Sequence, residues 1–254
     1  MNISIIIPAF DEEFRIAPTL RSVASLLEGY GKAFEIIVVD DGSRDRTASV
    51  VDEARKDIGN LLLISGGANR GKGHAVRRGM LSARGRVRLM CDADGSIPAS
   101  EMPKLLEPIL SGQVDVAIGS RYVKGSSTEN NPPAWRHLWS RFANMVVRAT
   151  LLPGVKDTQC GFKAFSARAA EAVFSQARIN GWAFDLEVLS LVRRYGYALT
   201  EVAINWSDDS RSRVEPVQDF LRVVRDWAKI YRNLHSGVYT FAENGVSAAG
   251  GKKP

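Results

Sequence analysis

Five short apolar runs in the first half of the chain each end in a polar or glycine-rich loop, and helical patterns lie between them. The runs cover residues 3–7, 34–39, 61–64, 86–91 and 114–118. The intervening helices are predicted over 14–28, 46–57, 73–83 and 100–110. A repeated order of strand, loop, helix and strand favours an α/β fold with a mainly parallel sheet.

Polar side chains gather at the points where these predicted strands end. They are Glu12, Asp40, Asp41, Asp92, Asp94 and Arg121. Asp and Gly are also common loop residues, so a single acidic motif would indicate only a turn. Acidic pairs after two strands and a basic residue after a third favour a ligand site, because open α/β sheets bind ligands outside the carboxyl ends of their strands.

The pattern changes after about residue 125, where a polar, proline-ended segment at 126–133 predicts a loop. Further elements are predicted as a helix over 134–151, a loop entering a strand over 157–166, a helix over 184–195, a strand over 198–204 and a helix over 216–234. No internal repeat or linker interrupts them, so we expect one domain over 1–234. The small, polar residues 235–254 predict a disordered tail.

Composition excludes several classes of protein. Only two cysteines occur among the 254 residues, so no disulfide framework holds the fold. No apolar run approaches the roughly 18–20 residues that a membrane span requires, and the first residues lack the pattern of a signal peptide. The net charge of +6 indicates anionic partners, such as phosphorylated ligands, nucleic acid or an acidic membrane. Clustered carboxylates argue against nucleic acid, because they would repel its phosphates.

The order of motifs along the chain resembles family 2 glycosyltransferases. The matching segments are PAFDEE at 8–13, VVDDGSRDRT at 38–47, NRGKGHAVRRGM at 69–80, DADGS at 92–96 and GSR at 119–121. Three segments of the second half resemble the dolichyl-phosphate glucosyltransferase branch of this family. They are DTQCGFKAF at 157–165, GWAFDLEVL at 181–189 and EVAINW at 201–206. The resemblance implies a GT-A fold with a nucleotide-sugar half, 1–121, and an acceptor half, 122–234.

Asp92 and Asp94 stand on either side of Ala93, directly after a predicted strand. Two such carboxylates suit Mg²⁺ or Mn²⁺, which take oxygen ligands from acids and substrate phosphates. An acidic turn is the alternative explanation. The resemblance implies that this Asp-x-Asp holds the metal on the diphosphate of a nucleotide-sugar. Related mannose synthases often carry Gln where Ser96 stands here, and this difference supports the glucosyl branch.

The resemblance also implies a pocket for the nucleotide. Either Asp40 or Asp41 would accept a hydrogen bond from the base, and a carboxylate suits both uracil and guanine. Residues 69–73 open a predicted helix, where backbone N–H groups suit a phosphate, although a flexible basic loop fits the same residues. The other residues expected to line this pocket are Pro8, Ala9, Phe10, Glu12, Lys72 and Gly73.

On the acceptor side, Arg121, Arg136 and Ser140 match the residue types with which related mannose synthases hold a lipid phosphate. Arg136 and Ser140 are four positions apart, so they share one face of the predicted helix. A planar guanidinium suits phosphate because it donates two parallel hydrogen bonds. For Arg136, a solvated position on the helix is an equal alternative.

Asp185, Gln159 and Trp182 complete the predicted acceptor site, with Asp185 and Arg121 as the catalytic pair. Many family members place a carboxylate beside the acceptor where Asp185 stands. A catalytic base deprotonates hydroxyl acceptors, but a phosphate acceptor is already anionic. Asp185 is therefore interpreted either as a base or as a residue that orients the sugar or a neighbouring cation.

The predicted helix over 216–234 alternates apolar and basic residues at helical spacing. Such a helix can lie in a membrane interface, or it can pack on the domain core. A lipid-linked acceptor favours the interface, so we expect a peripheral protein on the cytoplasmic face of a membrane.

Together the motifs predict an inverting, metal-dependent transfer of a hexose to dolichyl or polyprenyl phosphate, with UDP-glucose as the favoured donor. The alternatives are GDP-mannose as donor, a saccharide as acceptor, or a non-enzymatic protein that binds anionic surfaces.

Overall fold

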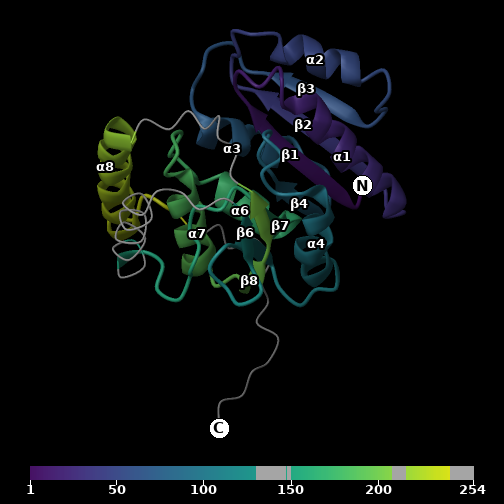
Figure 1. Cartoon of the computed structure of the whole chain (residues 1–254). Helices are drawn as coiled ribbons and strands as arrows, with labels where there is room; N and C mark the ends of the chain where they lie inside the picture. Colours follow the sequence, from purple (N-terminus) through teal and green to yellow (C-terminus); the bar gives the residue numbers. More distant parts are fainter. Residues whose placement is uncertain (130–146, 148–149, 208–215, 241–254) are drawn as a thin grey trace.

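The computed structural model describes residues 1–129, 147, 150–207 and 216–240. A seven-stranded sheet forms its centre, in the strand order β3-β2-β1-β4-β7-β5-β8 (Figure 1). These strands are β1 (Ile3–Ala9), β2 (Phe34–Asp40), β3 (Leu61–Ser65), β4 (Val87–Met90), β5 (Val116–Ser120), β7 (Lys163–Ser166) and β8 (Leu199–Ala203). Two further strands, β6 (Ser127–Glu129) and β9 (Asn205–Ser207), form a separate parallel pair.

Helices cover both faces of the sheet, and each face has its own apolar cluster. The helices are α1 (Ile16–Gly29), α2 (Thr47–Ala54), α3 (Lys72–Ser82), α4 (Met102–Leu110), α6 (Ala167–Phe174), α7 (Phe184–Arg194) and α8 (Pro216–His235), with a 3₁₀ turn at Ala99–Glu101. Ile5 of β1 packs toward α1, α2 and α4, whereas Ile6 packs toward α3, α6 and α7. The β-branched run of β1 is fully buried because both faces of the sheet are covered.

Strand β7 runs antiparallel to both of its neighbours, β4 and β5, whereas the other pairs in the sheet are parallel. Its first residue, Lys163, pairs with Met90 and Ile118 near the carboxyl ends of those strands. The segment that enters β7, residues 157–162, therefore lies at the edge of the sheet where the parallel strands end. This reversal brings a second-half motif next to the motifs of the first half.

The predicted α/β fold with a mainly parallel sheet is confirmed, and most predicted elements agree with the structure within a few residues. Cys91 and Cys160 are buried and unbridged. The predicted disordered tail from 235 is wrong for its first residues, because His235 belongs to α8 and Tyr239 is buried against Glu187. Most of the helix predicted over 134–151, and the tail after 240, lie outside the described residues.

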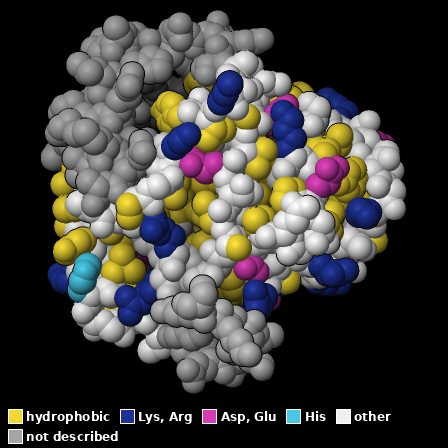
Figure 2. All heavy atoms as spheres, turned by 90° about the horizontal axis from the view of Figure 1, so that it is seen from below, with side chains coloured by type: hydrophobic (Ala, Val, Ile, Leu, Met, Phe, Trp, Pro, Cys, Tyr) yellow, Lys and Arg dark blue, Asp and Glu magenta, His cyan; other side chains and the backbone are white. Residues whose placement is uncertain are grey.

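Two surface properties bear on possible partners. None of the helices in the described ranges combines the length and apolar character needed to cross a bilayer. On the described part of the face seen in Figure 2, Lys and Arg side chains are interspersed with acidic and hydrophobic ones. A continuous basic stripe, which is the electrostatic footprint of nucleic-acid binding, is not present on that part of the surface.

Candidate active site

The carboxyl ends of β1, β2, β4 and β5 lie at one edge of the sheet, since these four strands run in the same direction. Each end is followed by one of the polar motifs of the sequence. The reversed strand β7 adds residues 157–162 to this edge, and the start of α7 adds Asp185. The fold thus collects residues from both halves of the chain at one place.

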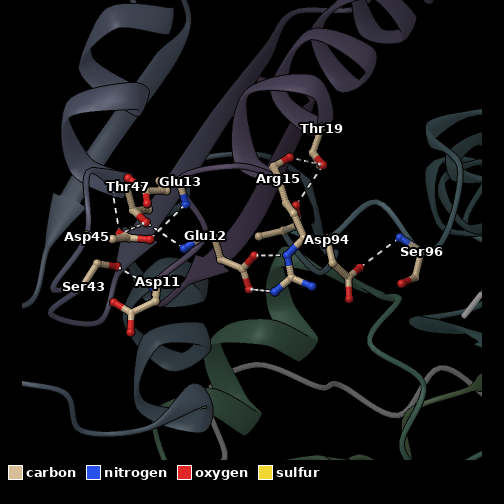
Figure 3. A network of polar contacts seen from close by, with 11 residues as sticks. Asp11, Glu12, Glu13, Arg15, Thr19, Ser43, Asp45, Thr47, Asp94 and Ser96 are labelled. Carbon is tan, nitrogen blue, oxygen red and sulfur yellow. Dashed lines mark hydrogen bonds and ion pairs between the residues drawn. The ribbon is translucent and has the colours of Figure 1, made fainter. Parts of the chain in front are cut away.

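The loop after β1 is fixed to the loop after β2 (Figure 3). Its three successive backbone N–H groups donate to side chains of the second loop: Asp11 N to Ser43 Oγ at 3.0 Å, Glu12 N to Thr47 Oγ1 at 2.7 Å, and Glu13 N to Asp45 Oδ2 at 3.1 Å. Asp11 has a φ of 55°, a left-handed conformation that Asp tolerates better than most residues. The two loops therefore form a single framework beside the candidate nucleotide pocket.

Glu12 is committed to an ion pair with Arg15. Arg15 Nε lies 2.6 Å from Glu12 Oε2, and its Nη2 lies 2.7 Å from Oε1. Figure 3 shows the guanidinium of Arg15 between the Glu12 carboxylate and Asp94. Of the other expected pocket residues in this loop, Pro8 and Ala9 are buried within β1 and Phe10 is half-buried. Both oxygens of the Glu12 carboxylate are thus occupied by the guanidinium of Arg15.

The two acids at the end of β2 have different surroundings. Asp41 accepts hydrogen bonds from Arg70 N and from Gly71 N, the latter at 2.6 Å, so it holds the loop before α3. Asp40 Oδ1 accepts from Ser43 N at 3.0 Å. Both acids are buried, and Asp41 accepts more backbone hydrogen bonds than Asp40 does.

Asp92 is held from two sides. Lys72 Nζ, at the start of α3, lies 2.6 Å from Asp92 Oδ1. From the other side the carboxylate approaches Gly161 so closely that a Cβ there would lie 2.0 Å from Asp92 Oδ2. A side chain at position 161 would therefore push the Asp92 carboxylate away from its present position.

The start of α3 is packed directly on the segment that precedes α7. A Cβ at Gly73 would lie 2.5 Å from the carbonyl oxygen of Ile179 and 2.5 Å from Cβ of Phe184. His74 N also donates to Asn180 O at 3.2 Å. Gly73 therefore acts as a close-packing position, and it links the NRGKG motif to the GWAFDLE motif.

Asp185 and Lys163 form a buried ion pair beneath this surface. Lys163 Nζ lies 2.7 Å from Asp185 Oδ1 and also donates to the carbonyl oxygen of Cys160. The Lys163 side chain is fully buried, and Asp185 is 4% exposed. Another acid of this region, Glu187, is also fully buried. It accepts hydrogen bonds from the backbone N–H groups of Arg178 and Ile179 and from the hydroxyl of Tyr239. Glu187 is thus held by contacts within the fold, and Asp185 by its ion pair with Lys163.

Lys72, Lys163 and three carboxylates form an alternating set of charges. Burial would lower the pKa of Lys72, but the carboxylates of Asp92, Asp185 and Asp94 outweigh it and raise that pKa. For Asp185, burial raises the pKa, and the cations Lys163 and Lys72 oppose this shift without cancelling it. Lys72 is therefore firmly protonated and is the cation shared by the three acids.

Arg121 is bound to Asp157, a residue of the DTQCGFK motif. Its Nε and Nη2 lie 2.7 and 2.9 Å from the two oxygens of Asp157, and its backbone N also donates to Asp157. Burial raises the pKa of Asp157, but its hydrogen bond and charge contact with Arg121 outweigh this and lower it. The guanidinium also lies over the rings of Trp206 and Tyr122. Arg121 is thus a rigid, oriented cation at the end of β5.

The remaining predicted acceptor residues are placed unevenly. Trp182 is 56% exposed, and Lys72 Nζ lies 5.2 Å from the centre of its ring. Gln159 is exposed in the loop before β7. Arg136 and Ser140 lie outside the described residues, so their predicted place in the site stays a prediction.

Sequence reasoning missed three residues that shape this site. The DTQCGFKAF motif assigns no role to Lys163. A lysine within the short apolar run FKAF is nevertheless a signal of a buried charge. Gly161 and Arg15 gave no such signal, because their importance comes from contacts with Asp92 and Glu12 across the fold.

Asp92 and Asp94 fit a hard divalent cation by the chemistry of their oxygens. Asp92 Oδ1 already holds a cationic group, the ammonium of Lys72, and Asp94 Oδ1 accepts from Ser96 N at 2.9 Å. Within the described ranges no group of three or more His, Cys, Asp or Glu residues is arranged to hold a metal. An ion bound here would therefore take further ligands from substrate phosphates and water, as Mg²⁺ usually does.

Comparison with known proteins shows the family to which the chain is similar. The model of the family described as glycosyl transferase family 2 matches residues 4–174. The dolichyl-phosphate beta-glucosyltransferase of Dictyostelium discoideum is 32% identical over 248 residues, with 93% of this chain and 76% of the relative covered. The human protein of the same name is 33% identical, with 89% of this chain and 73% of the relative covered.

Solved structures agree on the fold. Glucosyl-3-phosphoglycerate synthase of Mycobacterium tuberculosis, in complex with Mn²⁺, UDP-glucose and phosphoglyceric acid, superimposes with a TM-score of 0.66. The match covers 91% of this chain and 80% of that protein at 20% identity, so it establishes the GT-A-like fold. With the family match and the relatives at over 30% identity, it follows that the chain belongs to glycosyl transferase family 2 and is a glycosyltransferase.

Proposed function

We propose that this enzyme transfers glucose from UDP-glucose to a dolichyl or polyprenyl phosphate, with inversion at the anomeric carbon. The observation that carries the proposal is the position of the second-half motifs: Gly161 of DTQCGFK abuts Asp92, and the segment around GWAFDLE abuts Gly73. Relatives that match about nine tenths of this chain at 32–33% identity are named dolichyl-phosphate beta-glucosyltransferases in several species.

In the proposed donor site, Asp40 accepts from the imide N–H of uracil, and Phe10 packs beside the base. Lys72 approaches the diphosphate, as do the backbone groups at the start of α3, where a helix N-terminus favours negative charge. Arg15 is held by the carboxylate of Glu12 (Figure 3). The pocket thereby combines one carboxylate for the base with cations for the phosphates.

Asp92 and Asp94 are the residues that would hold Mg²⁺ or Mn²⁺. The bound ion supplies neutralisation of the charge that develops on the departing diphosphate. Solved structures of the same fold are complexes of a glucosyltransferase with UDP and Mn²⁺ or Mg²⁺, which supports this choice of ions. Asp94 is the more available ligand, because Asp92 is already engaged by Lys72.

In the transfer, an oxygen of the acceptor phosphate forms a bond to the anomeric carbon while the bond from that carbon to UDP breaks. The electron pair of the broken bond leaves with UDP, and the transition state has oxocarbenium character. The acceptor is already anionic, so no strong base is required. Asp185 is bound to Lys163, and we assign it the role of orienting Lys72 and the sugar.

The acceptor phosphate is proposed to meet Arg121, with Trp182 as an exposed aromatic surface beside the sugar. Asp157 is the buried counter-ion of Arg121, and its two oxygens orient the guanidinium. A protein that uses a lipid phosphate must reach a membrane surface. We therefore propose peripheral attachment on the cytoplasmic face, with the basic helix α8 as the contact.

Binding of nucleotide-sugars tests the donor part of this proposal. A panel of UDP- and GDP-sugars is titrated by calorimetry with Mn²⁺ present, and Asp94→Asn serves as the variant without the metal ligand. We expect UDP-glucose to bind best, and Asp94→Asn to lose metal-dependent binding while its melting temperature is unchanged. Tighter binding of GDP-mannose would overturn the donor assignment, and unchanged metal-dependent binding by Asp94→Asn would overturn the metal site.

A further inference from the structure

Lys72 lies between the proposed metal site and the proposed diphosphate site. Its ammonium is 2.6 Å from Asp92 Oδ1, the oxygen of a proposed metal ligand, and its side chain is 17% exposed. It is also the first residue of α3, at the helix N-terminus proposed to receive a diphosphate. A single cation thus faces both the proposed metal site and the proposed phosphate site.

The two lysines of this region differ in their freedom to move. Lys163 is fully buried and fixed between Asp185 and the carbonyl oxygen of Cys160. The Lys72 side chain keeps 17% exposure on a flexible four-carbon stem, and its Nζ lies 5.2 Å from the centre of the Trp182 ring. Lys72 is therefore the cation that can change partners.

The two oxygens of Asp92 have different neighbours. Oδ2 packs against Gly161, and Oδ1 faces Lys72. The same oxygen is needed for a metal ion at the Asp92–Asp94 pair. A lysine ammonium and a divalent ion cannot both bind this oxygen closely, because the two positive charges repel each other strongly at such a distance.

We propose that Lys72 competes with the divalent metal for Asp92, so that the metal binds tightly only together with a nucleoside diphosphate. When no donor is bound, Lys72 neutralises Asp92 and makes binding of the metal alone unfavourable. When metal and nucleotide enter together, Lys72 leaves Asp92 for the diphosphate. This inference rests on the proposed metal site and adds a linkage between the two ligands.

The formal charges are consistent with this exchange. In their ordinary ionised forms, Asp92, Asp94 and Asp185 contribute three negative charges, and Lys72 and Lys163 contribute two positive ones. A divalent ion alone would leave an excess of positive charge around Lys72. A nucleotide-sugar diphosphate, with two negative charges, compensates the ion and gives Lys72 a new anionic partner. Metal and nucleotide therefore favour each other, and the linkage acts equally in both directions.

Electron paramagnetic resonance of free Mn²⁺ measures this linkage on the full chain, with and without UDP and without any turnover. In the parent protein, saturating UDP should tighten Mn²⁺ binding by about tenfold or more. In Lys72→Met, binding of Mn²⁺ without UDP should become roughly tenfold tighter than in the parent, because a competing cation is gone. The enhancement by UDP should shrink by the same factor.

Two controls isolate the position of the charge. Lys32→Met removes one positive charge from an exposed residue at the opposite end of β2 and should bind Mn²⁺ as the parent does. Lys72→Arg keeps a cation beside Asp92 and should keep the weak binding without UDP. Thermal unfolding establishes that each variant is folded, and Lys72→Gln takes the place of Lys72→Met if the latter is not.

The outcomes separate this inference from the proposed function. If Mn²⁺ and UDP bind together in the parent, but Lys72→Met binds Mn²⁺ alone no better than the parent does, the competition is disproved while the metal site stands. If the parent binds no Mn²⁺ even with UDP, the metal site itself is wrong, and the competition fails with it.

Discussion

At the scale of single residues, the candidate site depends on close contacts between motifs that are far apart in the sequence. Asp92 lies between Lys72 and Gly161, Arg121 is bound to Asp157, and Asp185 is bound to Lys163. The sequence could predict which residue types gather at the strand ends. It could not predict these pairs, because a pair depends on how two distant segments meet in the folded chain.

Gly161→Ala tests whether the position of Asp92 matters for function. The added Cβ would lie 2.0 Å from Asp92 Oδ2, so the carboxylate must shift. We expect metal-dependent binding of UDP-glucose to weaken by at least about tenfold, since a misplaced ligand costs roughly 1.4 kcal/mol or more. Gly59→Ala, at a glycine with nothing within 4 Å of its Cβ and no positive φ, is the control for the loss of a glycine. Unchanged donor affinity in Gly161→Ala would refute the role of this contact.

Arg121 and Asp157 test whether a buried pair also serves the acceptor. Arg121→Ala should destabilise the fold by about 3–5 kcal/mol, because it leaves Asp157 buried and unpaired. The double variant Arg121→Met with Asp157→Leu removes both charges and should recover most of that stability, as measured by urea unfolding. We expect it to bind UDP-glucose normally and still fail to use prenyl phosphate. Recovery of prenyl-phosphate turnover in the double variant would show that Arg121 serves only the fold.

At the scale of elements, the alternation of strands and helices in the first half was predicted to within a few residues at each boundary. The boundaries of β1 and β2 follow from β-branched runs that end in polar loops. The reversed direction of β7 was not predictable, because hydrophobic periodicity is the same for parallel and antiparallel strands. That reversal decides the site, since it carries residues 157–162 to the edge where β4 and β5 end.

Helix α8 offers a prediction about the membrane. Val224 and Tyr231, seven positions apart and on one helix face, are 42% and 44% exposed, whereas Trp227 packs on the core and donates to Thr150. The neighbouring basic residues, all exposed, are Arg222, Arg225, Lys229 and Arg232. The double variant Val224→Ser with Tyr231→Ser should bind phosphatidylserine vesicles several-fold more weakly. Its melting temperature should fall less than that of Trp227→Ser, because it removes the stacking of Tyr231 on Trp227 but keeps the packed Trp227 ring.

The matched variants distinguish membrane contact from core packing. Leu81→Ser removes an equally exposed apolar side chain at the end of α3 and should leave vesicle binding unchanged. Trp227→Ser should instead lower the melting temperature, because it removes a packed ring and a hydrogen bond. Vesicle binding that is insensitive to Val224 and Tyr231 would rule out this face of α8 as the membrane contact.

At the scale of the whole molecule, the fold brings the polar motifs of the two halves of the chain to one edge of the sheet. The first half supplies Asp40, Lys72 and the Asp92–Asp94 pair, and the second half supplies Asp157 and Asp185. Family membership could be inferred from the order and spacing of several motifs, because each motif alone is too short to identify a family. The identity of the donor is harder to read, since a carboxylate at Asp40 suits uracil and guanine alike.

The central claim is tested most directly by turnover with a lipid acceptor. The purified chain is incubated with Mg²⁺ or Mn²⁺, detergent-dispersed dolichyl phosphate and radiolabelled UDP-glucose or GDP-mannose. The account predicts that label passes from UDP-glucose into the lipid as a β-linked glucosyl phosphate, faster than from GDP-mannose, and that chelation of the metal stops the reaction. Faster transfer from GDP-mannose, or label that enters a saccharide acceptor and never the lipid, would contradict it.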